Sequence, residues 1–137
     1  MIRLMLTATC LSAAMASSAL ALDCKTATGQ SDMNICADQD FKAADTALNA
    51  TYAQVVKRLP NAAAADAKSL LVAAQRDWVA FRDAECAFRT SDSEGGSMHP
   101  MDVQGCRRQL TEERTAALKR YLSCKPEDSD CPTGSAN

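Results

Sequence analysis

Apolar residues recur every three or four positions between about residue 29 and residue 59, which is the spacing of one helix face. These positions are Ala37, Phe41, Ala44, Leu48, Tyr52, Val55 and Leu59. Thr28 is the expected N-cap, and Pro60-Asn61 ends the segment. The pattern therefore predicts a long first helix over about 29–59.

Two later segments have the same periodicity. The predicted inner stripe of a helix over about 63–88 is Leu71, Ala74, Trp78 and Phe81, and that of a helix over about 98–122 is Val103, Cys106, Leu110, Ala117, Leu118 and Tyr121. Turn-forming residues from Ser91 to Ser97 separate them, and Pro100 is tolerated in a first helical turn. No alternating strand pattern occurs in the sequence. The predicted fold class is all-α: an antiparallel three-helix, up-down-up bundle.

The first 21 residues have the three-part pattern of a secretory signal peptide. Arg3 supplies the positive start, Leu4 to Leu20 is an apolar and small-residue run, and Ala19-Leu20-Ala21 is an A-x-A cleavage site. Cys10 is not preceded by a lipobox. We therefore expect cleavage after Ala21, export to the periplasm or beyond, and no membrane anchor in the mature chain.

Composition narrows the possible partners. The chain has 137 residues and a net charge of −2, which becomes −3 when Arg3 is removed, so it lacks the basic footprint of a nucleic-acid-binding protein. Much of its 47% hydrophobic content is alanine, which buries little area. We expect one domain with a thin core over 22–124, followed by a polar tail over 125–137.

The mature chain would keep six cysteines, and an even number in an exported protein indicates disulfides. They are Cys24, Cys36, Cys86, Cys106, Cys124 and Cys131. In an antiparallel hairpin, residues at equal height have a constant index sum, and Cys86 and Cys106 are centred on the Gly95-Gly96 turn. We therefore pair Cys86 with Cys106. Cys24 lies just before the first helix and Cys36 two turns into it, so the leading strand can fold back and join them, and Cys124 and Cys131 would then close a small loop in the tail. A swap among the first four stays open, because all four belong to the same end of the bundle.

The same index arithmetic predicts a polar cluster made of Asp45, Trp78, Arg82, Glu85 and Arg114. Arg82 is expected to pair with Asp45, and Arg114 to lie over Trp78 or near Glu85. Core-edge ion pairs and a cation–π contact explain such a cluster more simply than a ligand or catalytic site does.

Several spaced motifs resemble the LprI-like family of small secreted bacterial proteins, which is named for a lysozyme inhibitor. The most specific runs from Ala74 to Cys86 (AQRDWVAFRDAEC) and is similar to the family motif AQRxWxxFRDxEC. Met33-Asn34-x-Cys36-Ala37 precedes it, and Glu94-Gly95-Gly96-Ser97, Cys106 and Thr111-x-x-Arg114 follow. The resemblance spans residues 24 to about 124. It implies a protein partner, with lysozyme the first candidate, and it offers no catalytic residues.

An inhibitor of lysozyme must occlude a cleft that contains two carboxylates, and a preorganised loop does so at low entropic cost. The candidate partner-binding residues are Ser93, Glu94, Gly95, Gly96, Ser97 and His99. The alternative is that Gly95-Gly96 only makes the turn between two helices.

Other function classes are less favoured by the sequence. His99 is the only histidine and has no obvious nucleophile beside it, and no metal-ligand cluster or phosphate-binding loop is apparent. We expect a non-enzyme without a cofactor or metal. An envelope or stress-related adaptor that binds a protein through a helical face is the alternative function. A carrier of small molecules ranks last, because a thin three-helix core has little room for an internal cavity.

Overall fold

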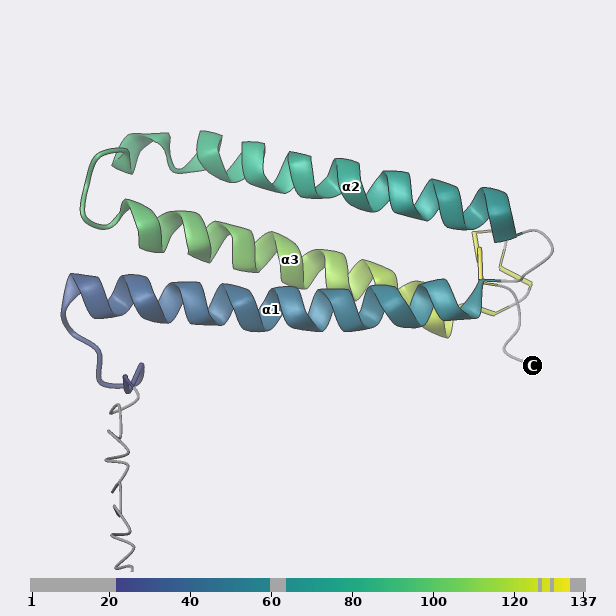
Figure 1. The fold of residues 1–137 in the computed structure, drawn as a ribbon, viewed down its shortest axis with the longest axis horizontal. Helices are drawn as coiled ribbons and strands as arrows, with labels where there is room; N and C mark the ends of the chain where they lie inside the picture. Colours follow the sequence, from purple (N-terminus) through teal and green to yellow (C-terminus); the bar gives the residue numbers. More distant parts are fainter. Residues whose placement is uncertain (1–21, 60–63, 126, 129, 134–137) are drawn as a thin grey trace, which may run out of the picture.

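The computed structural model describes residues 22–59, 64–125, 127–128 and 130–133. Within these ranges the chain forms α1 (Gln30–Arg58), α2 (Ala64–Arg89), the short 3-10 helix η1 (Ser91–Ser93) and α3 (His99–Ser123), and no strand (Figure 1). The predicted all-α fold is confirmed, and the predicted helix ends lie within about one residue of the observed ones. The expected signal peptide, residues 1–21, lies outside the described residues. None of the described helices is long and apolar enough to cross a membrane.

α1 and α3 run in the same direction and form the most closely packed pair of helices. Near one end the Asn34 side-chain amide donates to the Ser97 carbonyl at 3.0 Å. At the other end the Arg58 guanidinium donates to the Leu122 carbonyl. The number of residues from Asn34 to Arg58 is nearly the same as the number from Ser97 to Leu122, so the two helices run parallel. α2 runs antiparallel to both and packs mainly against α3 (Figure 1).

The core lies between α1 and α3. Its fully buried centre is Leu48, Val55 and Leu118, with Tyr52, Leu71, Trp78, Tyr121 and Leu122 packed around it. Thr51 and Thr115 are also buried, and each hydroxyl donates to the carbonyl one helical turn earlier. These small side chains let α1 and α3 approach closely, so the core is thin, as the alanine-rich composition indicates.

Thr28 is not the N-cap of α1, contrary to the sequence prediction. Gly29 holds that position with extended backbone angles (φ −77°, ψ 138°), and no side chain caps the helix. The Gly29 carbonyl accepts the first helical hydrogen bond from the Met33 N–H at 3.0 Å. Because α1 begins directly after Gly29, Thr28 lies one residue too early to reach the free amides of the first turn.

The buried side of α2 also differs from the prediction. Phe81 is 55% exposed, and Ala74 is exposed too. The side that faces α1 and α3 instead carries Leu71, Gln75, Trp78, Arg82 and Cys86. Arg82 and Cys86 find their partners on the other two helices, and these contacts set the rotation of α2. Phe81, one position before Arg82, is thereby turned outward.

Three disulfides join the six cysteines that the structure describes. The bonds are Cys24–Cys36, Cys86–Cys106 and Cys124–Cys131, each with a Cα–Cα distance of 5.6 Å. These are the pairs favoured in the sequence analysis. The first two lie at the end of the bundle where α1 begins, and the third lies at the opposite end.

Candidate functional site

The tip loop, residues 91–99, joins α2 to α3 at the end of the bundle where α1 begins (Figure 1). Two glycines determine its shape. Gly95 has a φ of +77°, a backbone conformation that favours glycine. A Cβ added at Gly96 would lie 3.0 Å from the Ser93 carbonyl oxygen. A side chain at either position would therefore strain or displace the loop backbone.

A chain of hydrogen bonds holds the tip loop in one conformation. The Ser93, Glu94 and Gly96 amides donate to carbonyls three residues earlier, at 3.1, 3.2 and 2.9 Å. The His99 amide donates to the Gly96 carbonyl at 3.2 Å, and the His99 Nδ1 lies 3.2 Å from the Ser93 hydroxyl oxygen. The loop is thus structured by its own backbone and by one side-chain pair.

Covalent and polar contacts attach this loop to all three helices. The Cys86–Cys106 disulfide joins α2 and α3 next to it, and Cys86 is fully buried. The Thr90 hydroxyl donates to the Cys86 carbonyl at 2.8 Å, and Asn34 of α1 donates to the Ser97 carbonyl. Such attachment preorganises a loop for binding.

Exposed apolar side chains flank the tip loop. Phe88, in the last turn of α2, is 76% exposed, and Met98 and Ile35 are about half exposed. Ile35 follows Asn34, which is hydrogen-bonded to the residue before Met98. We call Ile35, Phe88 and the tip loop the tip surface. Solvent-exposed aromatic and Met side chains are enriched at protein–protein interfaces.

The tip loop also presents unused hydrogen-bond donors. The backbone N–H groups of Gly95, Ser97 and Met98 donate to no acceptor among the described residues, and the residues themselves are exposed. They precede the N-terminus of α3, whose helix dipole favours negative charge. The side chains of Asp92 and Glu94 are the acidic groups of the loop.

The predicted polar cluster forms around Arg82, which is buried to 6% exposure. Arg82 Nη1 lies 3.4 Å from Asp45 Oδ1 and donates to the Thr111 hydroxyl at 3.4 Å, while Nε donates to Asp83 at 3.0 Å. Its guanidinium carbon is 5.1 Å from the Phe41 ring centroid and 5.3 Å from that of Trp78. The cluster joins α2 to both other helices.

Arg114 and Glu85 complete the set of predicted cluster residues. The Arg114 guanidinium carbon lies 5.9 Å from the centroid of the Trp78 ring, which is one of the two expected positions, and its Nε donates to Gln75 at 3.1 Å. Glu85, by contrast, makes no salt bridge or side-chain hydrogen bond with any residue that the structure describes. An ion pair that was not predicted joins Arg107 to this cluster, since its Nε is 3.2 Å from Asp83 Oδ1.

Sequence reasoning missed several members of both sites. Periodicity alone does not show which side of α2 is outward, so Phe88 received no role. Asp83, Arg107, Thr111 and Asn34 act through contacts between helices, and the only available signal was their presence in or beside the family motifs.

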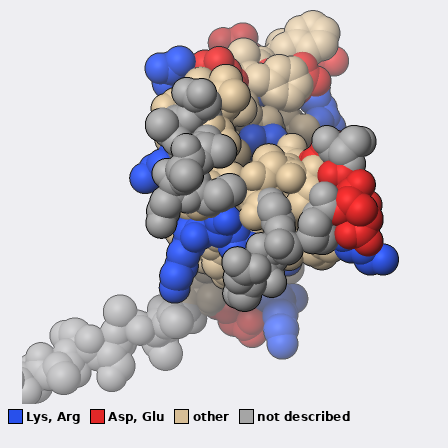
Figure 2. Space-filling model, turned by 90° about the vertical axis from the view of Figure 1, so that its right-hand side faces the viewer, with Lys and Arg blue, Asp and Glu red and all other residues tan. Residues whose placement is uncertain are grey.

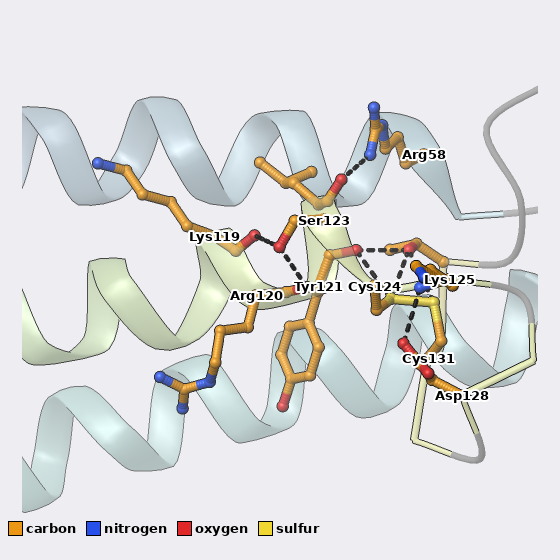
Figure 3. Close-up of a disulfide and its surroundings, with 11 residues drawn as sticks. Arg58, Lys119, Arg120, Tyr121, Ser123, Cys124, Lys125, Asp128 and Cys131 are labelled. Atoms are coloured by element: carbon orange, nitrogen blue, oxygen red, sulfur yellow. Dashed lines mark hydrogen bonds between the residues drawn. A yellow bond between two sulfur atoms is a disulfide. The ribbon is translucent and has the colours of Figure 1, made fainter.

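At the opposite end of the bundle, the Cys124–Cys131 disulfide closes a short loop after α3 (Figure 3). The Lys125 amide donates to the Asp128 carboxylate at 2.8 Å, and the Thr133 hydroxyl donates to the Tyr121 carbonyl at 2.6 Å. These bonds fold the residues after α3 back onto its last turn.

Comparison with known proteins places the chain in a family. A family model described as "Lysozyme inhibitor LprI" matches residues 23–118. An uncharacterized protein of Rhizobium meliloti is 45% identical over 109 residues, which cover 73% of this chain and 78% of that protein. No solved structure matches. Since the family match covers the disulfide-linked helices, the tip loop and the Arg82 cluster, the chain belongs to the LprI family.

Proposed function

We propose that this protein is exported, loses residues 1–21, and inhibits a lysozyme-type muramidase by inserting the tip loop into the active-site cleft. The observation that carries the proposal is a rigid, exposed loop, attached by a buried disulfide in a chain of this family. Because the loop is already ordered, little conformational entropy is lost on binding.

The chemistry of the tip surface is complementary to such a cleft. The catalytic cleft contains two carboxyl groups, and the free N–H groups of Gly95, Ser97 and Met98 supply donors for them. Phe88 and Met98 add exposed apolar area beside these polar groups. Large apolar side chains of this kind often supply most of the binding energy at the centre of a protein–protein interface. The mild net negative charge also favours approach to a basic enzyme.

The test is a titration of c-type lysozyme with the purified, oxidised mature protein, with residual cell-wall lysis as the readout. We expect saturable inhibition that Gly96→Ala weakens at least tenfold, because the new Cβ displaces the loop backbone. Gly105→Ala is the matched control: it lies in α3, its Cβ would meet nothing within 4 Å, and inhibition should be unchanged.

Two outcomes contradict this proposal. Equal inhibition by the wild type and Gly96→Ala would exclude the tip loop as the binding element. Absence of inhibition of c-type and of the other lysozyme classes would exclude the activity itself.

A second candidate function is a protein-interaction adaptor, and the exposed face of α2 favours it. Leu70, Phe81 and Phe88 follow one another at intervals of eleven and seven residues, which places them along one side of the helix, and all three are more than half exposed. Phe81→Ser distinguishes the two functions. It should leave lysozyme inhibition intact, whereas it should abolish capture of a partner that docks on α2.

A further inference from the structure

We propose that a groove at the end of the bundle opposite the tip surface binds an aliphatic carboxylate, such as a medium-chain fatty acid. The groove has a volume of about 290 Å³. It is lined mainly by Val55 and Leu59 of α1, by Leu70, Leu71 and Ala74 of α2, and by Tyr121 of α3, with Arg114 as its charged residue. The core is too thin for an internal cavity, but this site does not require one, because the groove lies at the surface between the helices.

The guanidinium of Arg114 identifies the head group. Its Nε donates to the side-chain oxygen of Gln75, and the guanidinium lies over the Trp78 ring. The two terminal nitrogens donate to no acceptor in the part of the chain that the structure describes. A guanidinium with two free terminal donors matches the two oxygens of a carboxylate. Gln75 and Trp78 hold it in place for that contact.

The apolar lining identifies the rest of the ligand. Arg114 and Ala74 lie at the inner end of the groove, whereas Tyr121 and Leu59 lie toward the end of the bundle. The seven residues from Arg114 to Tyr121 span about 10 Å along α3 at the helical rise. If each heavy atom with its hydrogens takes about 30 Å³, the volume of one water molecule in the liquid, the groove holds on the order of ten heavy atoms. A chain of about eight to ten carbons fits both estimates.

The surroundings of the groove agree with an amphiphilic anion. Leu70 is 69% exposed although it lines the groove, so this part of α2 has unpartnered apolar area. Lys57 and Arg58 form the basic last turn of α1 at the same end. Figure 2 looks onto this end and shows basic atoms near the middle of the face, surrounded by uncharged ones.

The experiment titrates the oxidised mature protein with decanoate below its micellar concentration, without lysozyme. Trp78 is the only tryptophan and lies against Arg114, so its fluorescence reports occupancy, and calorimetry gives the stoichiometry. We expect one decanoate per chain, and binding of butyrate, decanol and decyltrimethylammonium at least tenfold weaker. The short chain loses apolar contact, and the other two lack the anionic head.

Variants locate the site. Arg114→Gln should weaken decanoate binding at least tenfold, while Arg120→Gln, the same change at an exposed position of the same helix, should leave it unchanged. Ala74→Phe fills the groove from an exposed position, so it should block binding even if Arg114→Gln fails to fold. Gly96→Ala, at the far end, should bind decanoate as the wild type does.

Three results would overturn the proposal. These are no saturable binding of decanoate by the wild type, equal affinity for decanol and decanoate, and equal affinity of the wild type and Ala74→Phe. A dimer of the ligand-free protein that Ala74→Phe dissociates would also overturn it, because a second copy would then be the occupant of the groove.

Discussion

Arg82 connects α2 to the rest of the molecule through charge and aromatic contacts. Its carboxylate partners Asp45 and Asp83 are each about 40% exposed, whereas Arg82 itself is buried. The carboxylates therefore keep part of their hydration while they neutralise the buried guanidinium, which lowers the desolvation cost of the pair. Phe41 and Trp78 lie against the guanidinium and add cation–π stabilisation.

Substitution of Arg82 should therefore destabilise the fold. We expect Arg82→Ala to lower the free energy of unfolding by about 2–3 kcal/mol, since it leaves a cavity and removes the partner of two carboxylates. Arg82→Lys should recover only part of the loss, because an ammonium cannot bridge Asp45, Asp83 and Thr111 at once. Urea denaturation measures both.

The matched control is Arg76→Ala on the same helix. Arg76 is exposed, and among the described residues it pairs only with its neighbour Asp77, at 3.3 Å, so we expect a change below about 0.5 kcal/mol. If Arg82→Ala changed the free energy of unfolding as little as Arg76→Ala does, the cluster would have no structural role. A ligand-binding role would then be the better explanation of the cluster.

At the scale of the elements, α3 is the helix to which both others attach. It packs closely along α1 and receives the disulfide and the Arg82 contact from α2. Gly105 lies in its second turn and weakens it, because glycine has low helix propensity. No neighbouring atom requires a glycine at this position.

Gly105→Ala should therefore stabilise the protein. The expected gain is about 0.5–1 kcal/mol, which corresponds to a rise of a few degrees in the melting temperature followed by circular dichroism. A decrease in the melting temperature would show that the local backbone cannot accept a Cβ. Gly96→Ala should instead lower the melting temperature, since its Cβ would lie 3.0 Å from the Ser93 carbonyl oxygen.

The whole molecule combines a thin core with three disulfides that close loops at both ends. In the chain-entropy description, a bridge across 20 residues contributes about 3 kcal/mol and one across 7 residues about 2 kcal/mol. The buried Cys86–Cys106 bond therefore matters for stability and also holds the tip loop.

Removal of single bridges should separate these two effects. Replacing Cys86 and Cys106 by alanine should lower the free energy of unfolding by about 3 kcal/mol and weaken lysozyme inhibition at least tenfold. Replacing Cys124 and Cys131 should destabilise by about 2 kcal/mol and leave inhibition unchanged, because that bond lies at the other end of the bundle. Unfolding curves and the lysis assay distinguish them. Equal inhibition by both double variants would argue against a disulfide-supported loop.

The intact mass of the purified mature protein tests the disulfide set directly. Three bridges lower the mass by about six daltons relative to the reduced chain, two hydrogens per bridge. A difference of about four daltons would leave one pair of cysteines reduced.

Much of the fold followed from local patterns in the sequence. The three helices and their ends are determined by apolar periodicity and by turn formers, which act within a few residues of each other. The Cys86–Cys106 pair followed from index arithmetic, because an antiparallel hairpin with a known turn leaves few partners at equal height. The other two pairs were favoured because their cysteines are close in the sequence, and a swap among the first four cysteines stayed open. The Arg82–Asp45 pair followed from the same index arithmetic.

The rotation of α2 was decided by the tertiary structure alone. Apolar residues occur on several sides of this helix, so periodicity does not choose between the stripe with Phe81 and the stripe with Arg82. The contacts of Arg82 and Cys86 with α1 and α3 made that choice. They turned Phe81 and Phe88 outward and left the groove beside Arg114 open. The sequence by itself determined the elements and favoured the disulfide pairs that join them, and only packing between helices determined which side chains remain available for binding.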